Sequence, residues 1–130
     1  MILVVEDDLE VCTLYKFLLE REGYVIREAH TGREALIQLG LEAATENDGA
    51  PILPIVPNLI ILDIMLPEID GYTILSRLLQ NDILKMIPVV VITAKSRMSD
   101  LFMASSNVKS FFSKPFNPKS VREKIKEIIG

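Results

Sequence analysis

The 130-residue sequence is long enough for one domain with a single core, and it is 49% hydrophobic and 25% charged. Its net charge of −4 argues against direct nucleic-acid binding, and no apolar run reaches the roughly 18 residues that a membrane span needs. The N-terminus lacks the features of a signal peptide, and the lone Cys12 excludes an intrachain disulfide, so we expect a soluble cytoplasmic protein.

Five short apolar runs have the length of strands, and they alternate with segments whose apolar residues recur at helical spacing. The strands are expected at residues 2–5, 24–29, 59–62, 89–92 and 108–113. The helices are expected at residues 9–22, 33–41, 72–81 and 96–106, and from residue 118 onward. The second strand is more polar than the others and should lie at a sheet edge, because central parallel strands are buried on both faces.

Local signals mark the ends of several elements. Asp8 is a suitable N-cap for the first helix, and Gly23 follows that helix at a position that favours glycine. Asn117 and Pro118 suit the cap and first residue of the last helix. Residues 42–58 contain three prolines and are expected to form a surface loop longer than most connections in α/β domains.

The alternation of strands and helices predicts a mostly parallel sheet with helices on both faces. Chemically active side chains follow four of the five strands, at Glu6 and Asp7, Asp63, Thr93 and Lys114. Each alone would be an ordinary cap or strand-end residue. Together they favour a functional site, because the carboxyl edge of such a sheet is where ligands bind.

Carboxylates gathered at one edge repel each other, by roughly 4 kcal/mol for two unit charges about 4 Å apart at an effective dielectric of about 20. A hard divalent cation relieves this repulsion, and a site of few carboxylate oxygens suits Mg²⁺. A carboxylate beside Mg²⁺ and an ammonium group can attack phosphorus, because both cations offset charge on the transferring phosphoryl group. Asp63 is therefore predicted to be a nucleophile toward phosphorus.

Four motifs surround these residues: Val5–Glu6–Asp7–Asp8, the stretch Leu62–Gly71, Ile92–Thr93–Ala94 and Ser113–Lys114–Pro115–Phe116. In this order and spacing they resemble the receiver domain of two-component response regulators over essentially the whole chain. The resemblance implies one receiver domain across residues 1–130. It also implies a flavodoxin-like α/β fold, with a doubly wound five-stranded parallel sheet in the order 2-1-3-4-5 and five helices.

The same resemblance implies how the acidic residues act. Asp63 would accept a phosphoryl group from a sensor histidine kinase or a phosphotransfer protein. Glu6, Asp7, Asp63 and the backbone carbonyl of Met65 would hold Mg²⁺. Asp8 remains the helix cap rather than a metal ligand.

Residues of the last two strands would form the switch, by the same resemblance. Thr93 matches the hydroxyl that responds to the phosphoryl group, with Ala94 beside it in the phosphate-binding segment. Lys114 matches the lysine that pairs with the phosphate, and Phe111 the switch aromatic. A cis peptide bond is expected between Lys114 and Pro115.

Phosphorylation would change an outer face that contacts a downstream protein or an output domain, or that forms a homodimer through the last helix. Whether the chain is a whole protein or a receiver from a longer one stays open. No direct nucleic-acid or membrane partner is expected. The protein is not expected to be an enzyme beyond its own phosphorylation and dephosphorylation.

Two alternatives remain. One is a receiver that works by binding alone and is never phosphorylated, which the complete set of acidic, hydroxyl and lysine residues disfavours. The other is a phosphatase that resembles the haloacid dehalogenases, but those enzymes need a second aspartate where this chain has Met65.

Three further expectations concern residues outside these motifs. Cys12 falls at an inward helical position and should lie in the core. His30 is expected to be incidental, because no second metal-ligand candidate lies near it in sequence. Phe111 and Phe112 alternate across a strand, so one should be core and the other partly exposed.

Overall fold

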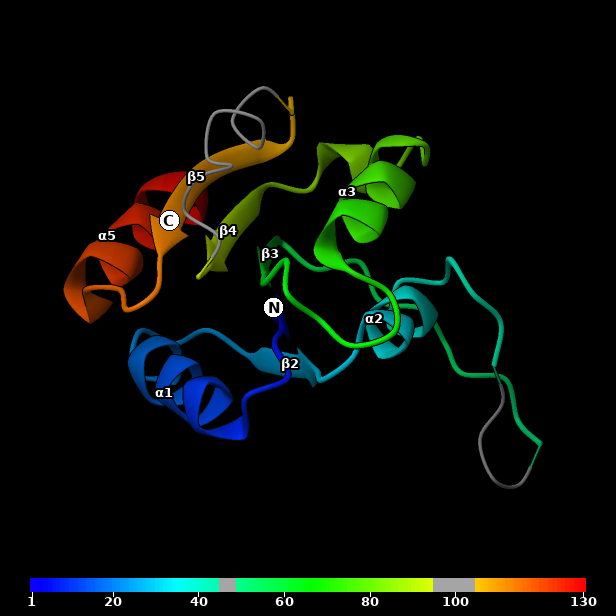
Figure 1. Ribbon diagram of the computed structural model, residues 1–130, viewed down its shortest axis with the longest axis horizontal. Coiled ribbons are helices and arrows are strands. Elements are labelled where there is room, and N and C mark those ends of the chain that lie inside the picture. The colour runs from blue at the N-terminus through cyan, green and yellow to red at the C-terminus, as the bar shows by residue number, and fades with distance from the viewer. Residues whose placement is uncertain (45–48, 95–104) are drawn as a thin grey trace.

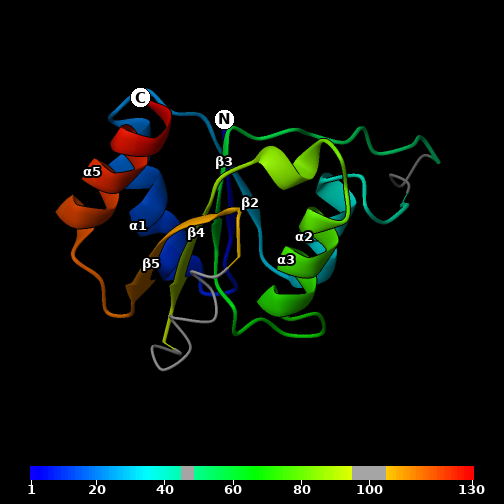
Figure 2. The ribbon, with the colours of Figure 1, turned by 90° about the horizontal axis from the view of Figure 1, so that it is seen from above.

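The chain forms a three-layer α/β sandwich in a computed structural model that describes residues 1–44, 49–94 and 105–130. The strands are β1 (Ile2–Val5), β2 (Ile26–Ala29), β3 (Leu59–Leu62), β4 (Val89–Thr93) and β5 (Val108–Ser113). The helices are α1 (Leu9–Glu20), α2 (Gly32–Gln38), α3 (Gly71–Leu79) and α5 (Pro118–Ile129), with a short 3-10 helix η1 (Leu84–Met86). Helices α1 and α5 cover one face of the sheet, and α2 and α3 cover the other (Figures 1 and 2).

The five strands are parallel and lie in the order β2-β1-β3-β4-β5, which confirms the predicted flavodoxin-like topology. Every residue of β1, β3 and β4 is buried, whereas β2 alternates between half-buried and exposed residues before Ala29. The predicted edge position of the second strand is therefore confirmed. Burial on both faces explains the uninterrupted apolar runs of the central strands.

Two apolar clusters form because alternate strand residues point to opposite faces. Leu3 and Val5 of β1 pack on the side of α2 and α3, whereas Ile2 and Val4 pack on the side of α1 and α5. Cys12 belongs to the second cluster and is buried, as predicted. None of the described helices is both long and apolar enough to span a bilayer.

Side-chain caps set several helix ends. Asp8 accepts hydrogen bonds from the amides of Glu10 and Val11 at the start of α1, and Asn117 caps α5 in the same way, so both predicted caps are confirmed. The first three predicted helices extended two or three residues too far at their carboxyl ends. Gly23 and Gly40 adopt left-handed φ values of 91° and 76° after α1 and α2, where the chain leaves the helix.

The helix count differs from the five α-helices expected. The described residues contain four α-helices together with η1, which the sequence did not predict. Of the helix predicted at 96–106, residues 96–104 lie outside the described part of the chain, and 105–107 form a turn into β5. The described part of the 42–58 loop forms no helix, as predicted, and is tied down by the Ile55 amide donating to the Gln38 carbonyl at 2.8 Å.

Gly71 lets the start of α3 approach the end of β3 closely. A Cβ at this position would lie 2.6 Å from the Ile64 Cα and 2.8 Å from the backbone oxygen of Asp63. The Gly71 amide also donates to the Ile64 carbonyl at 3.0 Å. The glycine therefore fixes how α3 packs against the backbone that carries Asp63.

We expect Gly71→Ala to lower the free energy of unfolding by about 1–3 kcal/mol, because the new methyl group overlaps backbone that has no room to move. Chemical denaturation measures the loss. Ser76→Ala, on an exposed position of the same helix, should change stability by no more than about 0.5 kcal/mol. Equal effects of the two substitutions would contradict this account of the close approach.

Candidate functional site

The strand register places the predicted site residues at one edge of the sheet. Val5 pairs with both Ala29 and Leu62, so the residues after β1, β2 and β3 end level with one another. The amide of Asp63 donates to the Val5 carbonyl at 3.0 Å, which extends the β1–β3 ladder to Asp63 itself. On the other side of β3, Thr93 pairs with Ser113, and Lys114 follows directly.

The acidic residues Glu6, Asp7 and Asp63 converge at this edge. Each offers one carboxylate oxygen, and the three oxygens lie within 4.8 Å of one another. Glu6 and Asp63 are 1% and 4% exposed, whereas Asp7 is exposed to solvent. A set of hard oxygen donors with one side open to water fits Mg²⁺.

Lys114 supplies the positive charge between the two buried acids. Its Nζ donates to Oε1 of Glu6 and, at 2.7 Å, to Oδ2 of Asp63. The Lys114 backbone amide donates to the Thr93 carbonyl at 2.9 Å, and the bond to Pro115 is cis, as predicted. The buried carboxylates are therefore paired, which burial of charged groups requires.

Burial and pairing shift the pKa values of two of these groups. Desolvation raises the pKa of Glu6 to about 7, although its hydrogen bonds from Lys114 and from the Asp8 amide act in the opposite direction. Burial acts to lower the pKa of Lys114, but hydrogen bonds to Asp63 and Glu6 outweigh it, and the pKa is raised. Lys114 is therefore charged at neutral pH, and Glu6 can exchange a proton there.

The other predicted residues surround this centre at different depths. Oδ1 of Asp63 accepts a hydrogen bond from the Met65 amide at 3.0 Å, which orients the carboxylate, and the Met65 side chain is 52% exposed. Thr93 is fully buried, and Ala94 next to it is exposed.

Phe111 and Phe112 depart from their expected pattern. They pack on opposite faces of the sheet, as alternation predicts, but both are only partly buried. The expectation that one would be core is wrong. Strand β5 lies at the edge of the sheet, where the described helices cover each face incompletely.

The structure also brings together residues that the sequence left apart. His30, expected to be incidental, has its Nε2 3.0 Å from Oε1 of Glu28, and both lie near the Cys12 sulfur. Glu28 and His30 are two residues apart on an extended segment and so share a face, which was the signal available in the sequence. The part played by Cys12 depends on helix packing and had no such signal.

The sequence profile of the response regulator receiver domain matches residues 2–126. The chain belongs to this family. Receiver domains of response regulators are components of two-component signalling systems, so the carboxyl edge described above lies in a protein of that class.

Two curated relatives support the assignment. The receiver is 35% identical over 129 residues to the alkaline phosphatase synthesis transcriptional regulatory protein PhoP of Bacillus subtilis, covering 98% of this chain and 48% of that protein. It is 34% identical over 129 residues to the transcriptional regulatory protein SrrA of Staphylococcus aureus, covering 98% and 47%. The chain thus spans about half the length of these relatives.

Solved structures agree with the receiver fold. A putative response regulator from Chloroflexus aurantiacus superposes with a TM-score of 0.80 at 28% identity, covering 98% of this chain and 95% of that one. The response regulator TrrA from Thermotoga maritima, solved in complex with Mg²⁺ and BeF, gives 0.76 at 28% identity, covering 98% and 96%.

In the absence of divalent cations, we expect the free energy of unfolding to fall as pH rises from about 4.5 to about 7, by up to about 3 kcal/mol. The folded receiver binds the Glu6 proton more tightly than the unfolded chain does. It therefore holds an extra proton in this window and is favoured at the acidic end. Glu28 does not contribute to this slope, because its hydrogen bond with His30 lowers the pKa of its carboxyl and so places its titration below this pH range.

Denaturant unfolding at a series of pH values in the presence of a chelator measures this slope. Glu6→Gln removes the titrating group and should flatten the profile over the window. A slope that is the same in the variant and the wild-type protein would assign the pH dependence to other groups.

Proposed function

We propose that Asp63 accepts a phosphoryl group from the phosphohistidine of a sensor histidine kinase or a phosphotransfer protein, and that the phosphorylated receiver signals through a changed outer surface. The observation that carries this is the arrangement around one buried carboxylate. Lys114 Nζ lies 2.7 Å from Asp63 Oδ2, and oxygens of Glu6 and Asp7 lie within 4.8 Å of an Asp63 oxygen.

The transfer forms one bond and breaks one. A carboxylate oxygen of Asp63 attacks phosphorus, the bond between phosphorus and the donor's imidazole nitrogen breaks, and its electron pair stays on that nitrogen. The Lys114 ammonium offsets negative charge on the phosphoryl oxygens as they arrive. The Met65 amide holds the carboxylate through Oδ1, which limits its rotation during attack.

Mg²⁺ would be held by the carboxylates of Glu6, Asp7 and Asp63 and by the backbone carbonyl of Met65. When bound, Mg²⁺ offsets the charge of the carboxylates and of the transferring phosphoryl group. The TrrA structure with Mg²⁺ and BeF supports this assignment, because a similar fold of the same family accommodates that pair. Glu6 must give up any proton it carries to act as a ligand, so Mg²⁺ binding should strengthen with pH near neutrality.

Thr93 and Phe111 are proposed to couple the phosphoryl group to the surface. Thr93 ends the buried strand β4, and Phe111 lies on the neighbouring strand β5, paired in register with Val91. A phosphoryl oxygen near Asp63 gives the Thr93 hydroxyl a new hydrogen-bond acceptor. The end of β4 would then move towards the phosphoryl group, with Ala94 beside that group. This movement would change how Phe111 packs and would shift the equilibrium between an inactive and an active conformation of the receiver.

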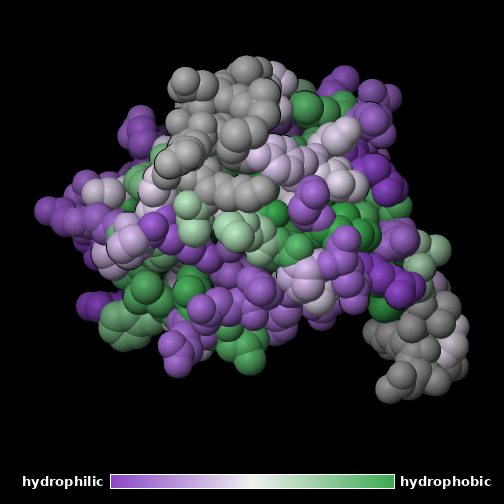
Figure 3. Space-filling model, in the orientation of Figure 1, coloured by the Kyte–Doolittle hydropathy of each residue, from purple (hydrophilic) through white to green (hydrophobic). Residues whose placement is uncertain are grey.

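A groove next to Lys114 is the proposed docking place of the phosphoryl donor. It has a volume of about 420 Å³, lies between α1 and the segment after β5, and is lined by Val11, Leu14, Lys114, Pro115 and Phe116. Apolar side chains reach the surface over α1 within a largely hydrophilic face (Figure 3). A partner that binds there reaches the carboxyl edge of the sheet where Asp63 lies.

The changed outer surface is proposed to contact a further partner. A downstream protein, an output domain or a homodimer through α5 remain predictions. Along α5, Lys119 pairs with Glu123 and Lys124 with Glu127 within the helix. Such exposed pairs contribute little and leave the face open to other partners.

The proposed nucleophile can be tested by incubating the protein with beryllofluoride or acetyl phosphate in the presence and absence of Mg²⁺. We expect one adduct per chain, formed only when Mg²⁺ is present. Fluorine NMR detects the beryllofluoride adduct, and intact mass detects the phosphoryl adduct. Asp63→Asn should abolish it, because the amide is a poor nucleophile. Asp82→Asn, which changes an exposed carboxylate on another part of the chain, should leave it intact.

Absence of an adduct in folded wild-type protein would favour a receiver that works by binding alone. Turnover of added phosphomonoesters would instead favour a phosphatase, for which Met65 stands where a second aspartate is needed.

Thr93→Ala is expected to form the beryllofluoride adduct but to lose the response of Phe111, because the acceptor oxygens no longer have this hydroxyl to bind. NMR shifts of the Phe111 ring and amide, compared with and without beryllofluoride, measure the response. Thr13→Ala, which removes an exposed hydroxyl from α1, serves as the control. An unchanged Phe111 response in Thr93→Ala would exclude the proposed coupling.

A further inference from the structure

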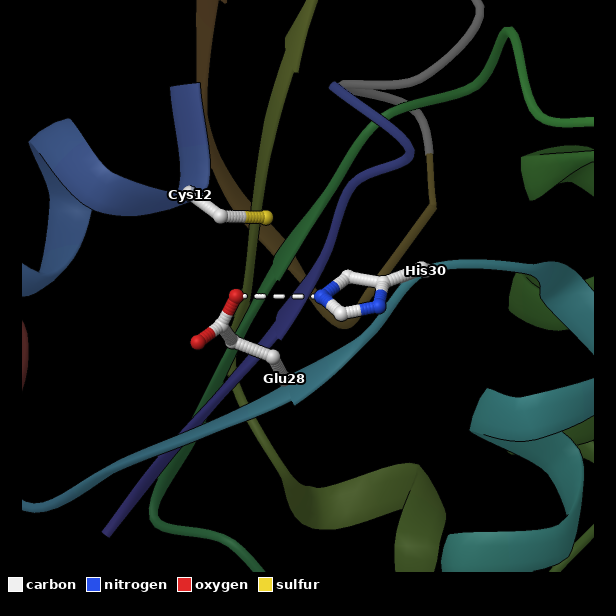
Figure 4. Close-up of side chains that lie close together, drawn as sticks. All are labelled: Cys12, Glu28 and His30. Carbon is white, nitrogen blue, oxygen red and sulfur yellow. Dashed lines mark hydrogen bonds and ion pairs between the residues drawn. The ribbon is translucent and has the colours of Figure 1, made fainter. Parts of the chain in front are cut away.

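A second cluster of metal-ligand side chains lies beside β2 and shares no residue with the acidic cluster. Cys12 comes from α1, Glu28 from β2, and His30 follows β2 directly. Figure 4 shows the three side chains pointing into one space. Their ligand atoms lie within 4.8 Å of one another, and nothing in the proposed phosphoryl transfer uses them.

The fold explains why they meet. Glu28 pairs in register with Val4, and Val4 faces α1 and α5, so Glu28 and the residue two positions later project towards α1. Cys12 lies on the buried side of α1, and its Sγ donates to the Glu6 carbonyl oxygen at 3.4 Å. The sulfur is thereby held over the same side of the sheet as the two β2-edge side chains.

The distances are close to those of a tetrahedral site. The Glu28 Oε1 and His30 Nε2 atoms are 3.0 Å apart, so a cation can replace the proton now shared between them. Bonds of about 2.0–2.3 Å to one metal ion place tetrahedral ligand atoms about 3.3–3.8 Å apart. Because the three ligand atoms lie within 4.8 Å of one another, the Cys12 sulfur needs to move by at most about 1 Å, which rotation about a single side-chain bond supplies.

The chemical types select the metal. The sequence has one cysteine and one histidine, and the fold brings this only thiol and only imidazole together with a carboxylate. Thiolate and imidazole ligands favour borderline-soft ions such as Zn²⁺ over Mg²⁺. A thiolate, a carboxylate and a neutral imidazole also balance the charge of a divalent cation.

We propose that Cys12, Glu28 and His30 bind a borderline-soft divalent transition-metal ion of the Zn²⁺ class, with water in the fourth position. The cluster is accessible from one side: the His30 and Glu28 side chains are 41% and 25% exposed, whereas Cys12 is 1% exposed. The ion enters from the imidazole side, and the open position faces solvent. This site does not depend on phosphorylation of Asp63.

Binding has identifiable costs. Burial raises the pKa of the Cys12 thiol to about 12, so uptake of the ion releases a proton to solvent and the hydrogen bond to Glu6 is lost. Lys16 Nζ lies 3.9 Å from the second oxygen of Glu28 and repels a cation weakly. Glu28 is already ionised, since its hydrogen bond with His30 lowers its pKa.

The test is a Co²⁺ titration of the tag-free, reduced protein in excess Mg²⁺, which occupies oxygen-only sites. We expect one equivalent of Co²⁺ to give a near-ultraviolet thiolate charge-transfer band and the intense visible bands of tetrahedral coordination, and Zn²⁺ to remove both. Because the chain has one cysteine, the band reports Cys12. A Co²⁺ absorbance that is proportional to protein concentration, together with the absence of a dimer in sedimentation experiments, excludes a site shared between two chains.

Three variants and one control locate the site. Cys12→Ser should abolish the charge-transfer band. His30→Gln and Glu28→Gln should each weaken Co²⁺ binding at least tenfold, because changing even a residue that hydrogen-bonds to a metal ligand lowers metal affinity by about that factor. His30 lies at the surface, so its variant tests the site without changing the core. Asp7→Asn, which alters only the acidic cluster, should bind Co²⁺ like the wild-type protein.

The absence of a charge-transfer band in the wild-type protein would overturn the proposal, as would equal affinity in the wild-type protein and His30→Gln. Loss of Co²⁺ binding in Asp7→Asn alone would assign it to the acidic cluster instead. The beryllofluoride adduct should still form in His30→Gln, so failure of one proposal leaves the other standing.

Discussion

The salt bridge of Lys114 with Glu6 and Asp63 is the interaction on which the carboxyl edge of this protein depends. Two carboxylates that are almost fully buried cannot both remain charged without a partner. The ammonium group reaches them from the far end of the chain, across 108 and 51 residues of sequence. It therefore links β1, β3 and β5 through one charge.

That charge arrangement is also what suits the edge to the proposed phosphoryl transfer. A phosphoryl group is an anion, and it can compete with the carboxylates for Lys114 once Mg²⁺ balances the acids. The raised pKa of Glu6 indicates that pairing with Lys114 offsets the burial of this one carboxyl only in part, because desolvation outweighs the hydrogen bonds that stabilise its charge. A centre short of positive charge is suited to take up a cation.

The parallel register of the strands also brings the cluster of Cys12, Glu28 and His30 close to the acidic cluster. Because β1, β2 and β3 end level, Glu6, His30 and Asp63 follow their strands at the same height. Cys12 touches both regions, since its sulfur contacts the Glu6 carbonyl and lies near Glu28 and His30. Hard oxygen donors and mixed sulfur, nitrogen and oxygen donors are thus neighbours that prefer different metal ions.

The sequence by itself determined the strand positions, the caps at Asp8 and Asn117 and the strand-end placement of Asp63, Thr93 and Lys114, because these follow from local patterns of burial and capping. It missed η1 and placed helix ends late, since tertiary contacts compete with helical propensity there. Only the tertiary structure decided that Phe111 and Phe112 share partial burial and that Cys12 meets His30. Those outcomes depend on which helix covers which face, and residues distant in sequence carry no local sign of their neighbours.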